Sequence, residues 1–149
     1  MTAITPDIES LSLNITEEIL VRSSLSATFA ALLEEMGPSN EGHNGAPLPM
    51  TLEPWPGGRW FRDLGDNSGH LWGHVQAIKR PTLLEITGPL MMSFAVASNL
   101  QYRLKEIEGG TLITLRHTAL GLFPDGYRDA LSQGWSLLFE RVRRRAERA

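Results

Sequence analysis

The chain has 149 residues, of which 42% are hydrophobic and 21% are charged, and its formal net charge at pH 7 is −3. These values are typical of one globular domain with a single core. They exclude the basic excess that a nucleic-acid-binding surface carries, so we expect no nucleic-acid partner. The chain contains no cysteine, which also excludes disulfides and thiolate chemistry.

The start of the chain shows no targeting signal. Residues 1–10 have neither the basic start nor the apolar stretch of a secretory signal, and no later run is long enough for a membrane span. We therefore expect no membrane span and a cytoplasmic localisation. The polar composition predicts a flexible tail over residues 1–10 and a single domain over residues 11–149.

The first two elements are a strand and a helix. The segment 13–21 is β-branched and partly alternating, which predicts a strand. Ser24 or Ser26 can cap a following helix, because a serine oxygen accepts an unpaired N–H of the first turn. The helix places apolar residues on one stripe and ends at Gly37-Pro38. The stripe consists of Phe29, Leu32, Leu33 and Met36.

Residues 37–49 form a loop, because eight of these thirteen residues are Gly, Pro or Asn. Two interpretations stay open: a plain connector, or a lid over a pocket.

A run of strands follows, separated by turns at residues 55–58 and 65–69 that contain glycine. The clearest hairpin has one apolar and one polar face on each strand, which indicates an antiparallel sheet covered on one side. The predicted strands before it are 50–54, 59–64, 70–78 and 83–87. The apolar face of the hairpin consists of Phe94, Val96, Leu100, Tyr102 and Leu104, and of Ile113, Leu115, His117 and Ala119.

A long helix begins at Pro124-Asp125 and runs almost to the end of the chain. Its apolar stripe is long enough to cross a sheet, and Gly134 would allow a close approach to whatever lies beneath. The stripe consists of Tyr127, Leu131, Trp135, Leu138 and Val142. Strands bracketed by helices indicate the α+β class.

Four motifs in this order carry a resemblance to a known superfamily. They are Pro56-Gly57-Gly58-Arg59-Trp60, the run Trp72–Ile78 with Pro81, the run Thr111–His117, and Gly134-Trp135 with Leu138 and Val142. Over residues 12–145 the chain resembles the START-like (SRPBCC, birch-pollen-allergen-like) superfamily. Within it, the chain is similar to the branch named after the C-terminal domain of the activator of heat-shock protein 90 ATPase.

The resemblance implies a helix-grip fold, in which a curved antiparallel sheet of about six or seven strands wraps around a long C-terminal helix. It also implies a cavity between the sheet and that helix. Relatives bind lipids, hormones or polyketides, and a minority catalyse cyclisation or hydration. Members usually carry a short second helix with a Trp after the first helix, and here the loop 37–49 replaces it.

Aromatic and histidine side chains are the candidate ligand-binding residues. Aromatic rings offer large apolar surfaces with few rotatable bonds, although the same rings could simply fill the core. A neutral histidine offers one donor and one acceptor to a ligand, although a core histidine bonded to a neighbour is the alternative. The candidate walls are Trp60, Trp72, Phe94, Tyr102 and Trp135, and the candidate polar anchors are His74 and His117.

No catalytic or metal-binding set stands out. His70 and His74 are four apart on a strand, so their Cα atoms lie roughly 13 Å apart and cannot share a metal. Glu53 and Glu85 could serve as acid and base if they faced inward, but surface positions are the default. A Gly-x-Ser-x-Gly elbow is absent. We expect no metal and no cofactor.

The only charge cluster lies near the C-terminus, where arginines complement the negative end of the last helix and are expected to form a solvated face. It consists of Arg141, Arg143, Arg144, Arg145 and Arg148.

Three functions are compatible with the sequence. The first is binding of a small hydrophobic molecule, such as a lipid or a polyketide, between the sheet and the last helix. The second is a cyclase- or hydratase-type enzyme that uses His117 with His74 or Glu85. The third is a co-chaperone-like module for a protein partner, which requires an exposed apolar patch that the sequence does not show. A protein partner or a homodimer stays open.

Overall fold

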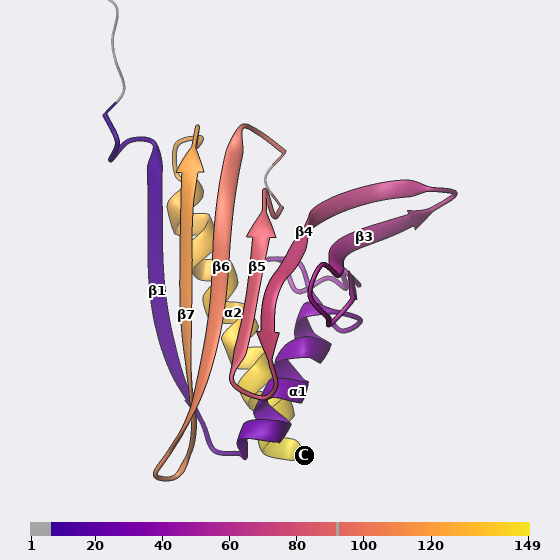
Figure 1. Cartoon of the computed structure of the whole chain (residues 1–149), viewed down its shortest axis with the longest axis vertical. Coiled ribbons are helices and arrows are strands. Elements are labelled where there is room, and N and C mark those ends of the chain that lie inside the picture. Colours follow the sequence, from indigo (N-terminus) through magenta and orange to yellow (C-terminus); the bar gives the residue numbers. More distant parts are fainter. Residues whose placement is uncertain (1–6, 92) are drawn as a thin grey trace, which may run out of the picture.

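The computed structural model describes residues 7–91 and 93–149, so residues 1–6 of the predicted tail lie outside the described residues (Figure 1). The elements follow the predicted order, with a strand and a helix first and a long helix last. They are β1 (Ser12–Val21), α1 (Leu25–Met36), β2 (Thr51–Leu52), β3 (Arg59–Gly65), β4 (Ser68–Lys79), β5 (Leu83–Gly88), β6 (Val96–Ile107), β7 (Gly110–Gly121) and α2 (Tyr127–Arg148).

The seven strands of the described residues form one antiparallel sheet in the order β1-β7-β6-β5-β4-β3-β2. The first strand pairs with the last, so β1 lies at one edge and the short β2 at the other. Both helices pack on the same side of the curved sheet, and α2 runs along its length (Figure 1). This arrangement confirms the predicted α+β helix-grip fold.

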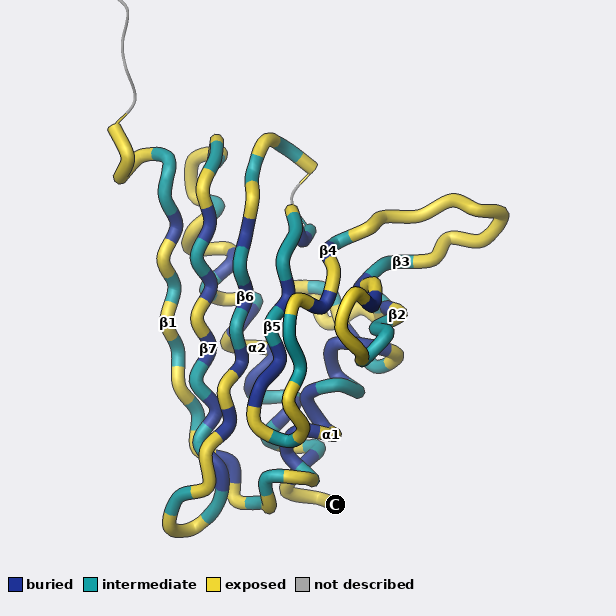
Figure 2. The backbone as a smooth tube through the Cα atoms, in the orientation of Figure 1, coloured by how far each residue is buried: buried dark blue, intermediate teal, exposed yellow. Residues whose placement is uncertain are grey.

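The two faces of the central strands differ in burial, as the alternation in the sequence predicts (Figure 2). On β6, Leu100, Tyr102 and Leu104 are buried, while Arg103 and Lys105 are exposed. Their partners on β7 continue each row across the sheet. The inner face therefore forms the floor of a core that the two helices cover.

The helix α1 begins as expected, because the Ser24 hydroxyl accepts a hydrogen bond from the Ala27 N–H at 3.1 Å. Its buried face departs from the predicted stripe in two places. Leu33 is only half-buried, and the carboxylate residue Glu35 is buried at 4% exposure. The first helix thus presents a charge to the interior of the protein.

The helix α2 begins at Tyr127 and not at Pro124-Asp125, because Gly126 adopts a left-handed conformation with φ of 77°. It buries a stripe that includes Leu131, Trp135 and Leu138, as predicted. Neither α1 nor α2, the helices of the described residues, combines the length and the apolar character that crossing a membrane requires.

The ends of β3 and β4 extend beyond the sheet as a hairpin arm (Figures 1 and 2). Residues 63–71 are exposed throughout, and they include Leu64 and Leu71. Asp66 and Asn67 both have positive φ at the tip, as a two-residue hairpin turn requires. His70 therefore lies far from any enclosed site.

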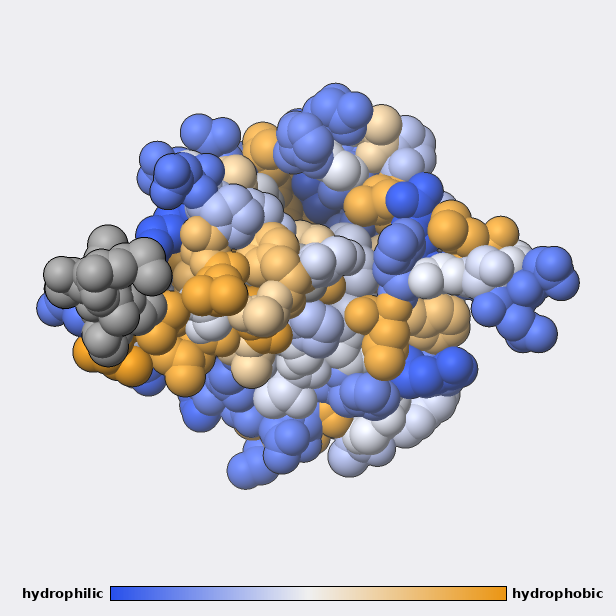
Figure 3. Space-filling view, turned by 90° about the horizontal axis from the view of Figure 1, so that it is seen from above, coloured by the Kyte–Doolittle hydropathy of each residue, from blue (hydrophilic) through white to orange (hydrophobic). Residues whose placement is uncertain are grey.

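Apolar side chains gather at the end of the molecule seen in Figure 3. Ile8, Leu120 and Leu122 are between 52% and 66% exposed, and backbone hydrogen bonds hold their segments together at this end. The sequence analysis expected no exposed apolar patch. It missed this one because the three residues come from different segments, and only the pairing of β1 with β7 brings them together.

Candidate ligand-binding cavity

A mostly apolar cavity of about 370 Å³ lies between α2, the sheet and the loop after α1. The helix contributes residues from four successive turns, so the cavity is elongated along α2. These residues are Tyr127, Ala130, Leu131, Gly134, Trp135, Leu138 and Arg141. A hollow therefore remains under the final helix, as a ligand-binding protein of this fold requires.

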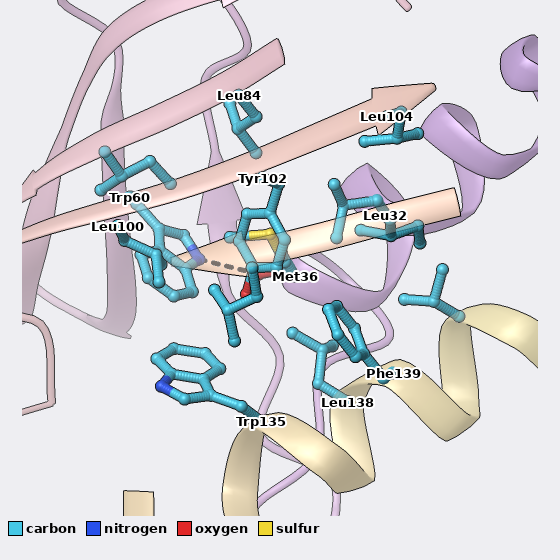
Figure 4. Packing of buried hydrophobic residues seen from close by; sticks show 14 of the residues in the cluster. Leu32, Met36, Trp60, Leu84, Leu100, Tyr102, Leu104, Trp135, Leu138 and Phe139 are labelled. Carbon is cyan, nitrogen blue, oxygen red and sulfur yellow. Dashed lines mark hydrogen bonds between the residues drawn. The ribbon is translucent and has the colours of Figure 1, made fainter. Parts of the chain in front are cut away.

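Two tryptophans form the sheet side of the cavity. Trp60 on β3 and Trp72 on β4 pack edge to face with ring centroids 5.0 Å apart. The indole N–H of Trp60 donates to the Met36 carbonyl at 2.8 Å, which fixes the ring against the end of α1. Figure 4 shows Trp60 projecting from the sheet and Trp135 from α2 towards the same interior region.

The loop 37–49 contributes the remaining wall, from Asn40 to His43 and at Leu48. Two hydrogen bonds join Asn40 and Leu48 across the loop. The Leu48 N–H donates to the Asn40 carbonyl, and Nδ2 of Asn40 donates to the Leu48 carbonyl. Glu41 and His43 are exposed at the rim. The loop thus borders the cavity, and its role as a lid stays a prediction.

Gly134 faces the cavity from the middle of α2. The sequence analysis explained this glycine by a close approach of the helix to its neighbour, and that explanation is wrong. A Cβ atom at this position would have no other atom within 4 Å. The missing side chain therefore leaves the cavity wider.

Gly134→Ala is expected to raise the free energy of unfolding by about 0.8–1 kcal/mol, because glycine is unfavourable inside a helix and the added methyl group has room. For a chain of this length the midpoint of thermal unfolding should rise by about 2–4 °C. Circular dichroism during heating measures it. An unchanged or lower midpoint would show that the site has no space for a methyl group.

The indole of Trp135 is hydrogen-bonded to the buried side chain of His117. The Trp135 indole N–H donates to Nδ1 of His117 at 3.1 Å, so Nδ1 must accept. The ring proton of the neutral His117 then lies on Nε2, which is 3.2 Å from the Ser98 hydroxyl oxygen. Burial lowers the pKa of His117 to about 4. Both ring nitrogens are engaged within the core, and the structure does not bring His117 to the cavity wall.

His74 lies on the other side of the sheet, where it is exposed, so the expectation that it points inward is wrong. A register irregularity near Val75, which is buried, accompanies this placement. Glu85 alternates with the buried Leu84 and Ile86 and accepts a hydrogen bond from Gln101 Nε2. His117 therefore meets neither of its proposed catalytic partners.

Glu53 also stays at the surface, as the default interpretation expects. Arg59 donates to both carboxylate oxygens of Glu53, at 2.8 and 3.1 Å. These hydrogen bonds lower the pKa of Glu53 to about 2. A carboxylate of this kind is a poor proton donor at neutral pH.

The other two aromatic candidates lie outside the cavity wall. Phe94 is half-buried and packs edge to face on Tyr127 with ring centroids 5.1 Å apart. Tyr102 is fully buried, and its hydroxyl has no hydrogen-bond partner among the described residues. Three of the seven candidate residues, Trp60, Trp72 and Trp135, therefore meet at the cavity.

The C-terminal arginines do not form one solvated face. Arg141 Nε donates to Oε1 of Glu35 at 3.0 Å, and Arg145 Nε donates to Oε2 at 2.5 Å. The side chains of Arg141 and Glu35 are only 10% and 5% exposed. The last helix therefore carries a buried ion pair to α1, and Arg141 also lines the cavity.

Within residues 7–91 and 93–149, no group of three or more His, Asp or Glu side chains is arranged to hold a metal ion. Besides the three tryptophans, the side chains with polar groups that line the cavity are Asn40, Glu41, His43, Tyr127 and Arg141.

Comparison with known proteins agrees with this architecture. An uncharacterised protein of Rhizobium leguminosarum superposes with a TM-score of 0.72 at 17% identity, over 93% of this chain and 96% of that one. Ara h 8.0201, a birch-pollen-allergen-like protein, gives 0.69 at 16% identity, over 93% and 99%. The chain has the helix-grip fold of these structures.

A third similar structure is the di-domain ARO/CYC StfQ of the steffimycin biosynthetic pathway, with a TM-score of 0.68 at 13% identity. The match covers 95% of this chain and 53% of StfQ, so the chain spans about half of that protein. Neither a family model nor a curated protein matches the sequence. At sequence identities this low, the similarity to these structures establishes the fold alone.

Several cavity residues were not among the sequence-based candidates. Tyr127, Leu131 and Leu138 were recognised only as the apolar stripe of the last helix, and a stripe does not reveal whether it covers a solid core or a hollow. The one available signal was Gly134, because a glycine inside a strong helical stripe costs stability and calls for a reason.

Proposed function

We propose that the protein binds a small hydrophobic molecule in the cavity under α2. The observation that carries the proposal is an elongated apolar space of about 370 Å³ walled by three tryptophans. This volume is within the range of small-molecule sites. The START-like fold of the chain, shared with Ara h 8.0201 and StfQ, supports the same conclusion.

Gly134 supports the proposal independently of the fold. A glycine at this position lowers helix stability by about 0.8–1 kcal/mol compared with alanine. No neighbouring atom requires it, since the space beside it is empty. The glycine has a reason if the empty space is needed for a ligand.

Gly134→Leu should therefore abolish binding while the protein stays folded. The leucine side chain would occupy the middle of the cavity, between Trp135 and Leu131 on the same helix. The neutral apolar dye N-phenyl-1-naphthylamine is a suitable probe, and its fluorescence rises on entering an apolar site. We expect saturable binding to the wild type and at least a roughly tenfold weaker affinity in the variant, a loss of about 1.4 kcal/mol.

Gln133→Leu is the matched control, because residue 133 is exposed on the same helix and does not line the cavity. It adds the same apolar side chain outside the site and should leave dye binding unchanged. The proposal is wrong if the wild type shows no saturable binding, or if both leucine variants bind the dye as the wild type does.

The enzymatic alternative has weaker support. It relies on an acid–base pair of His117 with His74 or Glu85, and these residues lie on opposite faces of the sheet. The similarity to the heat-shock protein 90 activator branch stays a prediction.

A further inference from the structure

Among the described residues, Arg141 is the only arginine or lysine that lines the cavity. Its Nε donates to Glu35, and this is the only hydrogen bond that Arg141 donates within the described part of the chain. A guanidinium has five N–H donors, and four of them belong to the two terminal nitrogens. With the side chain only 10% exposed and lining the cavity, these terminal donors reach little bulk solvent and are available to a group bound in the cavity.

The charge of Arg141 is not cancelled by Glu35 alone, because Glu35 is shared. Arg145 holds the second carboxylate oxygen, so one buried carboxylate faces two guanidinium groups. Arg145 is 37% exposed and also donates to Ser39, and its charge is partly solvated. The cluster thus presents positive charge at the end of the cavity that adjoins α1.

The other negative groups nearby do not face the cavity or are solvated. Glu34 accepts a hydrogen bond from Ser39, the partner of Arg145, at 2.8 Å, but it does not line the cavity. Glu41 lines the rim but is exposed, so water screens it. Glu17 accepts hydrogen bonds from Ser132 and Ser136, both at 2.9 Å, and does not line the cavity. His43, the other ionisable side chain at the rim, is exposed to solvent as well.

Tyr102 gives a second observation in the core near Arg141, although Tyr102 does not itself line the cavity. Its hydroxyl is fully buried without a partner among the described residues, and it projects from the sheet towards the helices (Figure 4). Burial raises the pKa of Tyr102 well above its usual range, so the hydroxyl keeps its proton; the charge of Glu17 adds to this shift and the charge of Arg141 partly opposes it. The interior near Arg141 therefore holds a protonated hydroxyl that no acceptor among the described residues binds.

We propose that the ligand is an amphiphilic carboxylate, whose head group binds the terminal nitrogens of Arg141 and whose apolar body extends along α2 between Trp135 and Trp60. A guanidinium matches a carboxylate in geometry and charge, and such hydrogen bonds are stronger than neutral ones. This inference rests on the proposed cavity function and adds the chemical class of the ligand.

The test compares dodecanoate with 1-dodecanol, which have the same chain and differ in the charge of the head group. Each displaces N-phenyl-1-naphthylamine from the wild type, and the displacement curves give the two affinities. We expect dodecanoate to bind roughly tenfold or more tightly, as charged hydrogen bonds of this strength predict. Equal affinities overturn the inference but not the proposed function. Absence of dye binding overturns both.

Three variants separate recognition by Arg141 from a structural role of the ion pair. Arg141→Gln should remove the preference for dodecanoate. Glu35→Gln frees Arg141 from its internal carboxylate and should keep or increase the preference. Arg144→Gln removes the same charge from an exposed position of α2 and should leave it unchanged. Circular dichroism confirms that each variant is folded.

If the ion pair has only a structural role, Arg141→Gln and Glu35→Gln should both lose the preference for dodecanoate. That result overturns the inference. If Arg141→Gln does not fold, the comparison of wild type with Glu35→Gln still decides the question, because loss of the preference for dodecanoate in Glu35→Gln overturns the inference and its retention or increase supports it. A preference that persists in Arg141→Gln places the anion elsewhere and overturns the inference as well.

Discussion

Replacing Glu35 with alanine is expected to lower the free energy of unfolding by about 3–5 kcal/mol. The change removes the shared acceptor of Arg141 and Arg145 and leaves Arg141, only 10% exposed, without its ion-pair partner. A buried charge without a partner loses its hydration with little in return. Urea unfolding at pH 7, followed by circular dichroism, measures the loss.

Arg143→Ala is the matched control on the same helix. Arg143 pairs with Glu140 one turn away, and both side chains are at least 40% exposed. Exposed pairs of this kind contribute about 0–1 kcal/mol, since water solvates the partners when the pair is broken. Similar losses in Glu35→Ala and Arg143→Ala would contradict the burial of the Glu35 cluster.

The double variant Glu35→Leu with Arg141→Met should recover most of the lost stability. Replacing a buried pair by apolar side chains of similar volume is often neutral or stabilising, because no charge is left to desolvate. Stability alone then does not account for the charged pair, and the cavity beside Arg141 offers another role for the charge. The double variant should therefore be stable and should lack the preference for dodecanoate.

The central strands of this protein could be predicted well from the sequence, because each has one solvent-exposed face and one buried face. The alternation around Tyr102 and Leu115 fixes which side chains point inward, and the structure pairs these two residues directly. His74 shows the limit of this reasoning. The pairing of β4 with β5 is irregular between Val75 and Ala77, and a shift of one residue moves a side chain to the other face.

The cavity was less predictable than the fold, because it depends on distances between elements remote in sequence. Glu35 follows Leu32 at helical spacing, but a charged residue on such a stripe normally marks the solvent edge. It is buried because two arginines more than a hundred residues later reach it. Local sequence patterns predict which face of α1 and of α2 is buried. They do not predict how the two helices are positioned along each other, and the contact of Glu35 with the arginines depends on that position.

The stability of the protein is expected to fall by about 2 kcal/mol between pH 7 and pH 5 through His117 alone. Burial lowers the pKa of His117 from its ordinary value of 6.5 to about 4. Between these values the unfolded chain binds a proton that the folded chain does not, so lowering the pH favours unfolding. The hydrogen bonds agree, because Nδ1 accepts from Trp135 and has no place for a second proton.

Urea unfolding of wild type and His117→Gln at both pH values isolates this contribution, since glutamine does not titrate and the remaining groups are common to both proteins. The wild type should lose about 2 kcal/mol more than the variant. His70→Gln is the matched control, because His70 is exposed on the hairpin arm, and it should follow the wild type. Equal pH dependence in all three proteins would mean that His117 accepts a proton in the folded state. The bond from Trp135 would then have to break first, and with it the contact that fixes this cavity wall against the sheet.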